Sequence, residues 1–109
     1  MKPVIKIADS FFSTSKTHYA FLDGKACQSL EKAYTCLEDQ LLFPDYFSHN
    51  LDSLDELLSD LEWIPQKRIR LVISNSKSLL SKNPEKKEAF IDTLNEHQNE
   101  RLEIFYLSA

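Results

Sequence analysis

Apolar and polar residues separate onto two sides of the stretch from residue 51 to residue 61. Five leucines recur there at helical spacing, namely Leu51, Leu54, Leu57, Leu58 and Leu61. Such a stripe is typical of a helix that packs one face against a core. Asn50 precedes the stripe and can accept a hydrogen bond at the start of a helix, while Pro65 cannot continue one. The pattern therefore predicts a helix that begins at Leu51 and has ended by Pro65.

The opposite side of this predicted helix carries acidic residues and no basic residue. It consists of Asp52, Asp55, Glu56, Ser59 and Asp60, with Glu62 at its margin. Asp52 complements the positive end of the helix dipole. However, Asp52 and Glu56 are a like-charge pair four residues apart, which costs about 0.2–0.5 kcal/mol. The face is therefore a solvated surface without a role, a surface that pairs with the basic run 66–70, or a binding surface for a basic partner.

An aromatic loop precedes the acidic face. Phe43 and Phe47 are predicted to be core residues, whereas Tyr46 has a polar hydroxyl and is predicted to face outward. Exposed aromatic rings beside unpaired carboxylates suit a basic partner that also offers a flat surface. This combination favours the binding surface.

The rest of the chain alternates between predicted strands and helices. Strands are predicted at 19–22, within 66–73 and at 102–107, and helices at 30–41 and from residue 84 onward. Strands that are separated by helices pair in parallel through right-handed crossovers. The sequence therefore predicts a small α/β protein.

Turn and cap residues mark the boundaries of these elements. Asp23 and Gly24 end the first strand, and the glycine, the only one in the chain, suits a positive φ. Ser29 is predicted to cap the helix that follows. Asn83 is predicted to cap the last helix through its amide oxygen, with Pro84 at the first helical position.

Length and charge narrow the function. The chain has 109 residues, which suits one domain with a single core, and a formal net charge of −4. This balance argues against nucleic acid as a partner, which needs a basic patch, and fits a cationic protein. No apolar run reaches the roughly 18–20 residues of a membrane span, and no signal peptide is indicated. We therefore expect a cytoplasmic protein that does not bind membranes.

Reactive chemistry is not indicated. Cys27 and Cys36 match no zinc or redox spacing, and in a cytoplasmic protein we expect reduced thiols rather than a disulfide. The histidines are scattered, so no metal site is predicted, and a single glycine cannot form a phosphate-binding loop. Asp52 and Glu56 lie on a convex helix face rather than in the cleft of a catalytic pair, so we predict no enzyme and no cofactor. His49 either tunes the surface near neutral pH or enters the helix without a role.

The segment FPDYFSHNLDSLDELL, within residues 42–58, resembles the loop and second helix of the barstar family, bacterial intracellular inhibitors of the ribonuclease barnase. Upstream, AFLDGKACQSLEKAYTCLEDQLLFP follows the family pattern without a gap from Ala20 to Pro44. The resemblance implies a barstar-like fold over residues 18–109, a small parallel sheet packed with helices in a single α/β domain. Residues 1–17 would then be an N-terminal extension that adds an edge strand or covers the sheet.

In this family, the loop and the second helix block the nuclease active site, where inhibitor carboxylates take the place of substrate phosphates. The resemblance thus implies an immunity protein of a toxin–antitoxin pair, monomeric when free, that inhibits a basic nuclease toxin. A barstar-like adaptor for a protein that is not a nuclease is the alternative. Together with the acidic face, the predicted partner-binding residues are Tyr46, His49, Asn50, Asp52, Asp55, Glu56, Ser59 and Glu96. Asp55 stands where the family has its interface tryptophan, and Glu56 where it has its principal inhibitory aspartate.

Overall fold

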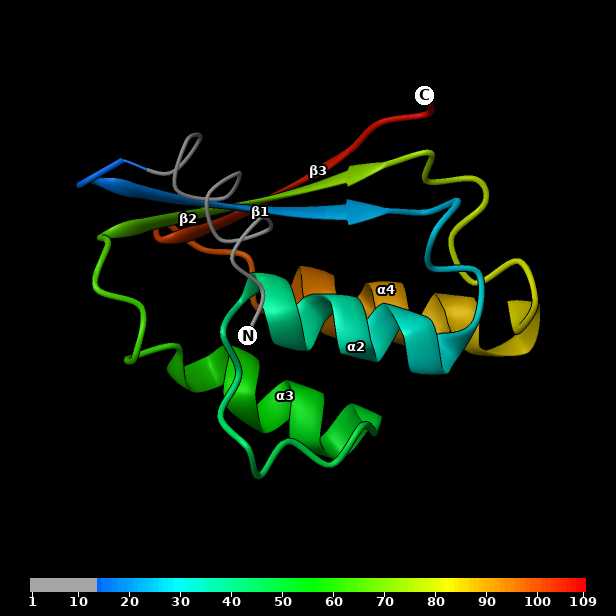
Figure 1. Ribbon diagram of the computed structural model, residues 1–109, viewed down its shortest axis with the longest axis horizontal. Coiled ribbons are helices and arrows are strands. Elements are labelled where there is room, and N and C mark those ends of the chain that lie inside the picture. Colours follow the sequence, from blue (N-terminus) through cyan, green and yellow to red (C-terminus); the bar gives the residue numbers. More distant parts are fainter. Residues whose placement is uncertain (1–13) are drawn as a thin grey trace.

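The computed structural model describes residues 14–109, which alternate between parallel strands and helices (Figure 1). The strands are β1 (Thr17–Asp23), β2 (Arg68–Ser74) and β3 (Leu102–Tyr106). The helices are α2 (Leu30–Gln40), α3 (Leu51–Asp60) and α4 (Pro84–Glu96). The predicted extension falls largely outside the described residues, and so does any edge strand within it. No helix in the described part is long and apolar enough to cross a membrane.

The sheet has the order β1-β2-β3, and both strand pairs are parallel. The predicted parallel α/β fold is therefore confirmed. Ala20, Leu71 and Ile104 stand side by side across the three strands, and all three are buried. Alternate residues along β1 and β2 are buried in the same way. The sheet therefore turns one apolar face toward the helices.

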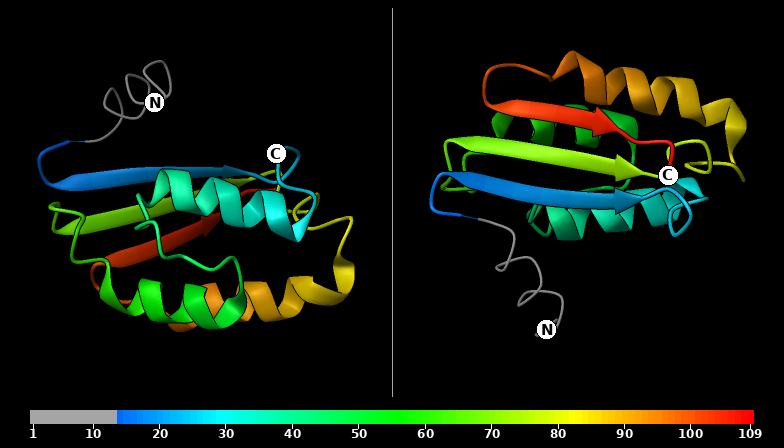
Figure 2. Two further views of the ribbon diagram at one scale, coloured as in Figure 1. Left: turned by 60° about the horizontal axis from the view of Figure 1, so that its bottom comes forward. Right: turned by 90° about the horizontal axis from the view of Figure 1, so that it is seen from above.

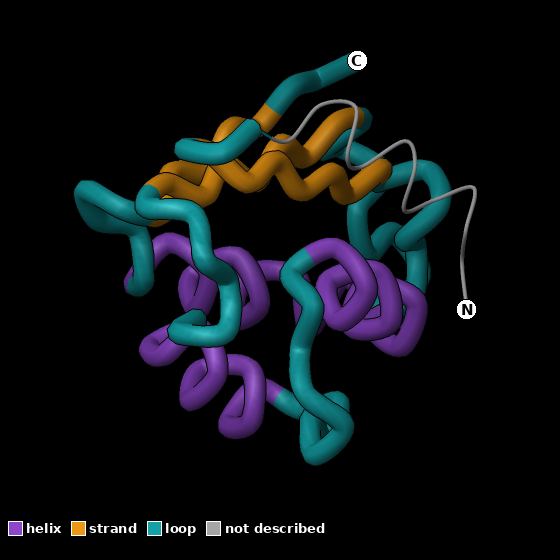
Figure 3. Tube along the Cα trace, turned by 60° about the vertical axis from the view of Figure 1, so that its left-hand side comes forward, coloured by secondary structure: helices purple, strands orange, loops and turns teal. Residues whose placement is uncertain are grey.

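Within residues 14–109, all three helices lie on that side of the sheet, and α3 lies farther from the strands than α2 does (Figure 1). Figure 1 shows α2, α3 and α4 below the strands, Figure 2 shows the same elements from two further directions, and Figure 3 shows the helices on one side of the sheet. The core lies between the sheet and the helices, where Tyr34, Leu37, Leu54, Phe90 and Leu94 are almost fully buried. Helices α3 and α4 also contact each other. The aromatic loop and α3 thus lie at the side of the molecule that faces away from the sheet.

Gly24 is required for a different reason from the predicted one. Its φ is not positive, so the prediction of a left-handed turn residue is wrong. Instead, the backbone that follows β1 passes against the backbone that follows β2. The Gly24 N–H donates to the Ser74 carbonyl at 2.7 Å, and a Cβ atom on Gly24 would lie 2.0 Å from the Asn75 carbonyl oxygen. Any side chain at position 24 would therefore collide with a backbone atom.

The helix caps also differ in part from the prediction. Ser29 caps α2 as expected, accepting a hydrogen bond from the Lys32 N–H at 3.2 Å. The Asn83 side chain makes no cap bond to its own helix, so that prediction is wrong. Its amide oxygen accepts from the Leu30 N–H at 2.8 Å and thus caps α2 instead. Tertiary contact has redirected a local signal, because the starts of α2 and α4 lie next to each other.

Candidate protein-binding surface

The loop between α2 and α3 turns two aromatic rings inward and one outward. Phe43 and Phe47 are 7% and 6% exposed, and their rings meet edge to face with centroids 4.9 Å apart. Phe43 also packs against Trp63, and Phe47 against Tyr34. Tyr46 is 64% exposed. The predicted positions of the loop rings are therefore confirmed, and the two buried rings fix a loop that presents Tyr46 to solvent.

Helix α3 begins at Leu51, as predicted. The Asn50 side chain accepts a hydrogen bond from the Ser53 N–H at 2.7 Å, and the Ser53 hydroxyl accepts one from the Ser48 N–H at 3.1 Å. These bonds join the end of the loop to the first turn of the helix. The inward residues of the leucine stripe are Leu54, Leu57, Leu58 and the capping Leu61. The acidic face of α3 consequently points into solvent.

A side chain that is distant in sequence, Arg101, holds the other end of α3. The Arg101 guanidinium, which comes from the turn before β3, donates to three backbone carbonyls beyond the last helical residue. Its partners are the oxygen atoms of Leu61 at 3.0 Å, Ile64 at 2.6 Å and Gln66 at 3.0 Å. The Leu61 carbonyl also accepts from the Ile64 N–H at 3.2 Å. Helix α3 is therefore fixed at both ends.

The acidic face contains two kinds of carboxylate. Asp52 and Glu56 are exposed, and within residues 14–109 neither forms an ion pair or a side-chain hydrogen bond. The Asp55 carboxylate instead lies 2.7 Å from Nε2 of His97, at the end of α4. The Ser59 hydroxyl donates to the Glu56 backbone carbonyl at 2.6 Å. Of the predicted α3 residues, Asp52 and Glu56 are thus the acids that the fold itself does not use.

The basic run 66–70 does not neutralise this face. Arg70 Nε lies 3.5 Å from a carboxylate oxygen of Glu103 on the neighbouring strand. In the part of the chain that the structure describes, no ion pair joins the run to α3. The interpretation that the basic run pairs with the acidic face is therefore wrong.

His49 lies between two carboxylates of α2. Its Nδ1 is 2.5 Å from Glu31, and its Nε2 is 3.0 Å from Glu38. A neutral imidazole donates from only one ring nitrogen, so this arrangement favours the imidazolium, which donates from both. The hydrogen bond to Glu38, supported by the one to Glu31, raises the pKa of His49 above its ordinary value. His49 therefore ties the loop to α2, and its effect on partner binding near neutral pH stays a prediction.

Glu96 is the one predicted residue that lies on a different helix from the rest of the surface. It is the last residue of α4, it is exposed, and it directly precedes His97. Because His97 contacts Asp55, the end of α4 lies beside α3. The fold thus places Glu96 at the margin of the acidic face.

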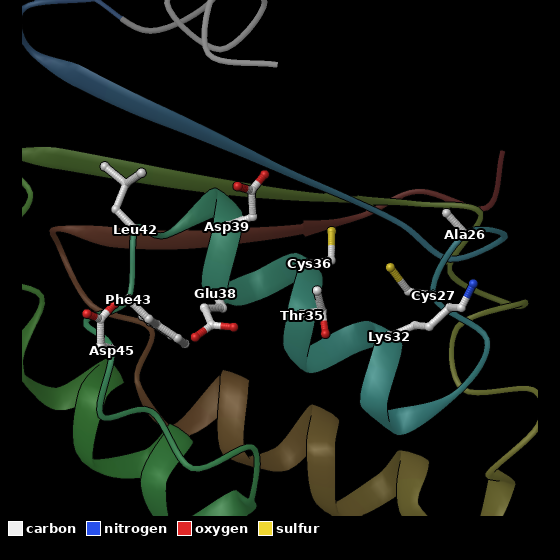
Figure 4. A pocket seen from close by; sticks show the side chains of 10 residues that line it. All are labelled: Ala26, Cys27, Lys32, Thr35, Cys36, Glu38, Asp39, Leu42, Phe43 and Asp45. Atoms are coloured by element: carbon white, nitrogen blue, oxygen red, sulfur yellow. The ribbon is translucent and has the colours of Figure 1, made fainter. Parts of the chain in front are cut away.

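An enzyme would need a cleft that converges on the acids of α3. A hollow of about 920 Å³ does open beside α2, and Figure 4 shows the side chains around it. Its lining includes Cys27, Lys32, Cys36 and Asp45, and no residue of α3 belongs to it. Within the described residues, no group of three or more potential ligands could hold a metal ion. The acidic face of α3 therefore lies outside this hollow.

The sequence did not reveal the side chains that hold this surface in place. Glu31 and Glu38 are seven residues apart on α2 and share one helix face, so a signal for their cooperation was present. Nothing local pairs His97 with Asp55, or Arg101 with the end of α3, because each pair joins distant parts of the chain. These contacts depend on the tertiary fold.

Comparison with known proteins agrees with this geometry. A model of the family described as barstar (barnase inhibitor) matches residues 17–107. The match runs from the first residue of β1 to just beyond β3, so it covers every described strand and helix. Among curated proteins, none matches the chain.

Proposed function

Because the chain belongs to the barstar (barnase inhibitor) family, we propose that it is an immunity protein that inhibits a basic nuclease toxin by covering its active site. Members of this family are inhibitors rather than enzymes, and membership implies a ribonuclease as the partner. In the proposed complex, α3 and the preceding loop face the nuclease. Tyr46, Asp52 and Glu56 form the centre of the contact.

The unpaired state of Asp52 and Glu56 is the observation that carries this proposal. The two carboxylates lie one helical turn apart, are exposed, and have no partner within residues 14–109. A nuclease active site holds cationic side chains that bind phosphate groups, and arginine binds carboxylates and phosphates with the same paired donors. Two exposed carboxylates are therefore matched to groups that otherwise bind substrate.

The other predicted residues receive different roles. Asp55 is already paired with His97, so we assign it a supporting contact. Tyr46 supplies the flat aromatic surface, and Asn50 and His49 hold the loop and the helix in their relative positions. Ser59 and Glu96 lie at the margin. The longer side chain of Glu56 and the missing ring at Asp55 favour a target whose cleft differs in shape from that of barnase.

Rigidity and charge support binding through this surface. The loop and both ends of α3 are fixed by buried rings, a helix cap and Arg101. Little conformational entropy is therefore lost when the surface binds a partner. The net charge of −4 attracts a cationic cleft over distance and speeds association. The complex should weaken as salt rises, because salt screens exposed charges.

The first test captures the partner. The tagged full-length chain is immobilised and exposed to extract of the cells that make it, at low and moderate salt. We expect a basic protein whose ribonuclease activity appears only after its release from the column, and which is retained less well at the higher salt. Capture of a partner that is not a nuclease, indifferent to salt and lost on Tyr46→Ala alone, would favour the adaptor.

The second test uses matched variants against the captured nuclease. Asp52→Asn and Glu56→Gln should each weaken inhibition by roughly 30-fold or more, because the loss of one partner of a close interfacial charge pair costs about 2–5 kcal/mol. Their free energy of unfolding should change by less than about 1 kcal/mol, because the relief of the like-charge pair is offset in Asp52→Asn by the lost interaction with the helix dipole. Asp92→Asn, an exposed acid of α4, is the control and should inhibit normally. Full inhibition by both α3 variants, or a large loss of stability in both, would refute the proposed surface.

A further inference from the structure

Two thiols meet in the hollow beside α2. Cys27 lies in the loop between β1 and α2, and Cys36 lies on α2 itself. Both residues line this hollow, and Figure 4 shows their two sulfur atoms close together in it. Neither residue belongs to the proposed binding surface. The fold thus brings together the only two cysteines of the chain.

The backbone around both sulfur atoms is fixed. The Cys27 N–H donates to the Asp23 carbonyl at 3.0 Å, and the Cys27 carbonyl accepts from the Leu80 N–H at 3.1 Å. The Cys36 thiol donates a hydrogen bond to the carbonyl oxygen of Phe21 on β1 at 3.6 Å. A disulfide needs the sulfur atoms to approach to about 2.05 Å. Both side chains already line the same hollow (Figure 4), so the fold brings the two residues into one site.

The two thiols differ in reactivity. The neighbouring Cys36 thiol, aided by the charge of Lys32, lowers the pKa of the Cys27 thiol. The neighbouring Cys27 thiol, together with burial, raises the pKa of the Cys36 thiol. The thiolate is the nucleophile in cysteine chemistry. Cys27 is therefore suited to react first, and Cys36 to resolve the product and give up its proton in that step.

Access limits the size of the reagent. Cys27 is only 2% exposed and Cys36 is half-buried, yet both line a hollow of about 920 Å³. A large disulfide such as another protein would not reach Cys27 without opening the fold. A molecule as small as hydrogen peroxide can enter the hollow and reach the Cys27 sulfur.

We propose that Cys27 and Cys36 form a reversible thiol–disulfide pair that hydrogen peroxide oxidises. The Cys27 thiolate attacks one peroxide oxygen, so that an S–O bond forms, the O–O bond breaks, and the second oxygen leaves as hydroxide and becomes water. The Cys36 sulfur then attacks the Cys27 sulfenic acid while its proton passes to the departing oxygen. An S–S bond forms and a second water leaves. The two sulfur atoms lose two electrons to the peroxide, and a dithiol reductant restores both thiols.

The test follows peroxide oxidation of the reduced full-length chain. Samples are quenched with a thiol-alkylating reagent, and the intact mass and the peptides that contain Cys27 and Cys36 are measured over time. The wild-type chain should lose two hydrogen atoms, become resistant to alkylation at both cysteines, and recover with dithiothreitol. The same chain unfolded in urea should form the intramolecular disulfide on the order of tenfold more slowly, because the fold no longer places the thiols together.

Single variants separate the roles of the two cysteines. Cys36→Ser should accumulate a sulfenic acid at Cys27 that dimedone traps, whereas Cys27→Ser should react with peroxide on the order of tenfold more slowly than wild type. Circular dichroism tests whether each variant folds. If a variant does not fold, the peptide maps of the wild-type chain test the proposal instead. The proposal fails if both wild-type thiols remain open to alkylation, if the disulfides link separate chains, or if Cys27 proceeds to sulfinic acid without pairing with Cys36.

Discussion

Replacement of Arg101 tests how the end of α3 is held. The guanidinium is half-buried and donates to the carbonyls of Leu61, Ile64 and Gln66 at 2.6–3.0 Å. Arg101→Met retains much of the apolar stem and removes all of these donors. Arg101→Lys retains the charge but cannot reach three carbonyls with the planar geometry of a guanidinium. We expect both variants to fold but to be less stable than the wild-type chain. Arg101→Met should be the less stable of the two.

The magnitude follows from the hydrogen bonds. A hydrogen bond to a charged group contributes about 1.5–3 kcal/mol, but three bonds from one side chain are not additive. Water reaches part of this half-buried site and hydrates some of the carbonyls once the arginine is absent. We therefore expect Arg101→Met to lower the free energy of unfolding by about 2–4 kcal/mol. Arg68→Met, an exposed arginine at the start of β2, is the matched control and should change it by less than about 0.5 kcal/mol.

Urea unfolding measures the global effect, and hydrogen exchange locates it. The amides in the last turn of α3 should lose protection in Arg101→Met before those of β2 and β3 do. A loss of stability below about 0.5 kcal/mol would mean that water replaces the guanidinium without cost. A uniform loss of protection throughout the sheet would mean that Arg101 acts on the core rather than on the end of α3. Either outcome would contradict the reasoning.

Three further predictions rest on single contacts. Gly24→Ala should destabilise the fold by about 2 kcal/mol or more in urea unfolding, because its Cβ would lie 2.0 Å from the Asn75 oxygen, and Ala26→Ser nearby should not. Glu38 and Glu31 of α2 raise the pKa of His49. The stabilisation that the His49 imidazolium contributes is therefore complete below pH 6.5 and is lost as pH rises through the raised pKa. His49→Gln should remove this pH dependence of the urea midpoint. His97→Gln should cost about 0.5–1 kcal/mol through the lost contact with Asp55, whereas a loss of 3 kcal/mol would indicate a core role.

Local patterns were sufficient to predict much of the fold. The leucine stripe and Asn50 gave the start of α3 correctly, because a helix cap and helical spacing are properties of neighbouring residues. The inward rings of Phe43 and Phe47 and the outward Tyr46 followed from polarity. The parallel sheet followed from the alternation of strands and helices.

The errors have a common physical cause. Gly24 and Asn83 were assigned local roles, but each serves a segment that is distant in sequence: the carbonyl of Asn75 and the first turn of α2. The same holds for the Asp55–His97 contact, which distinguishes Asp55 from Asp52 and Glu56. The spacing of Asp52, Asp55 and Glu56 along the helix predicted the same exposed position for all three carboxylates. Only the tertiary structure shows which of them remain unpaired.

The central position of β2 also affects when the proposed inhibitory surface can form. Strand β2 lies between β1 and β3, yet it is synthesised after β1, α2 and α3. At roughly 5–20 residues per second, the leucine face of α3 waits seconds for the sheet on which it depends. Parallel pairing of distant strands is also intrinsically slow. In a cell that makes both proteins, protection against the nuclease would therefore follow the number of completed inhibitor chains rather than the number begun.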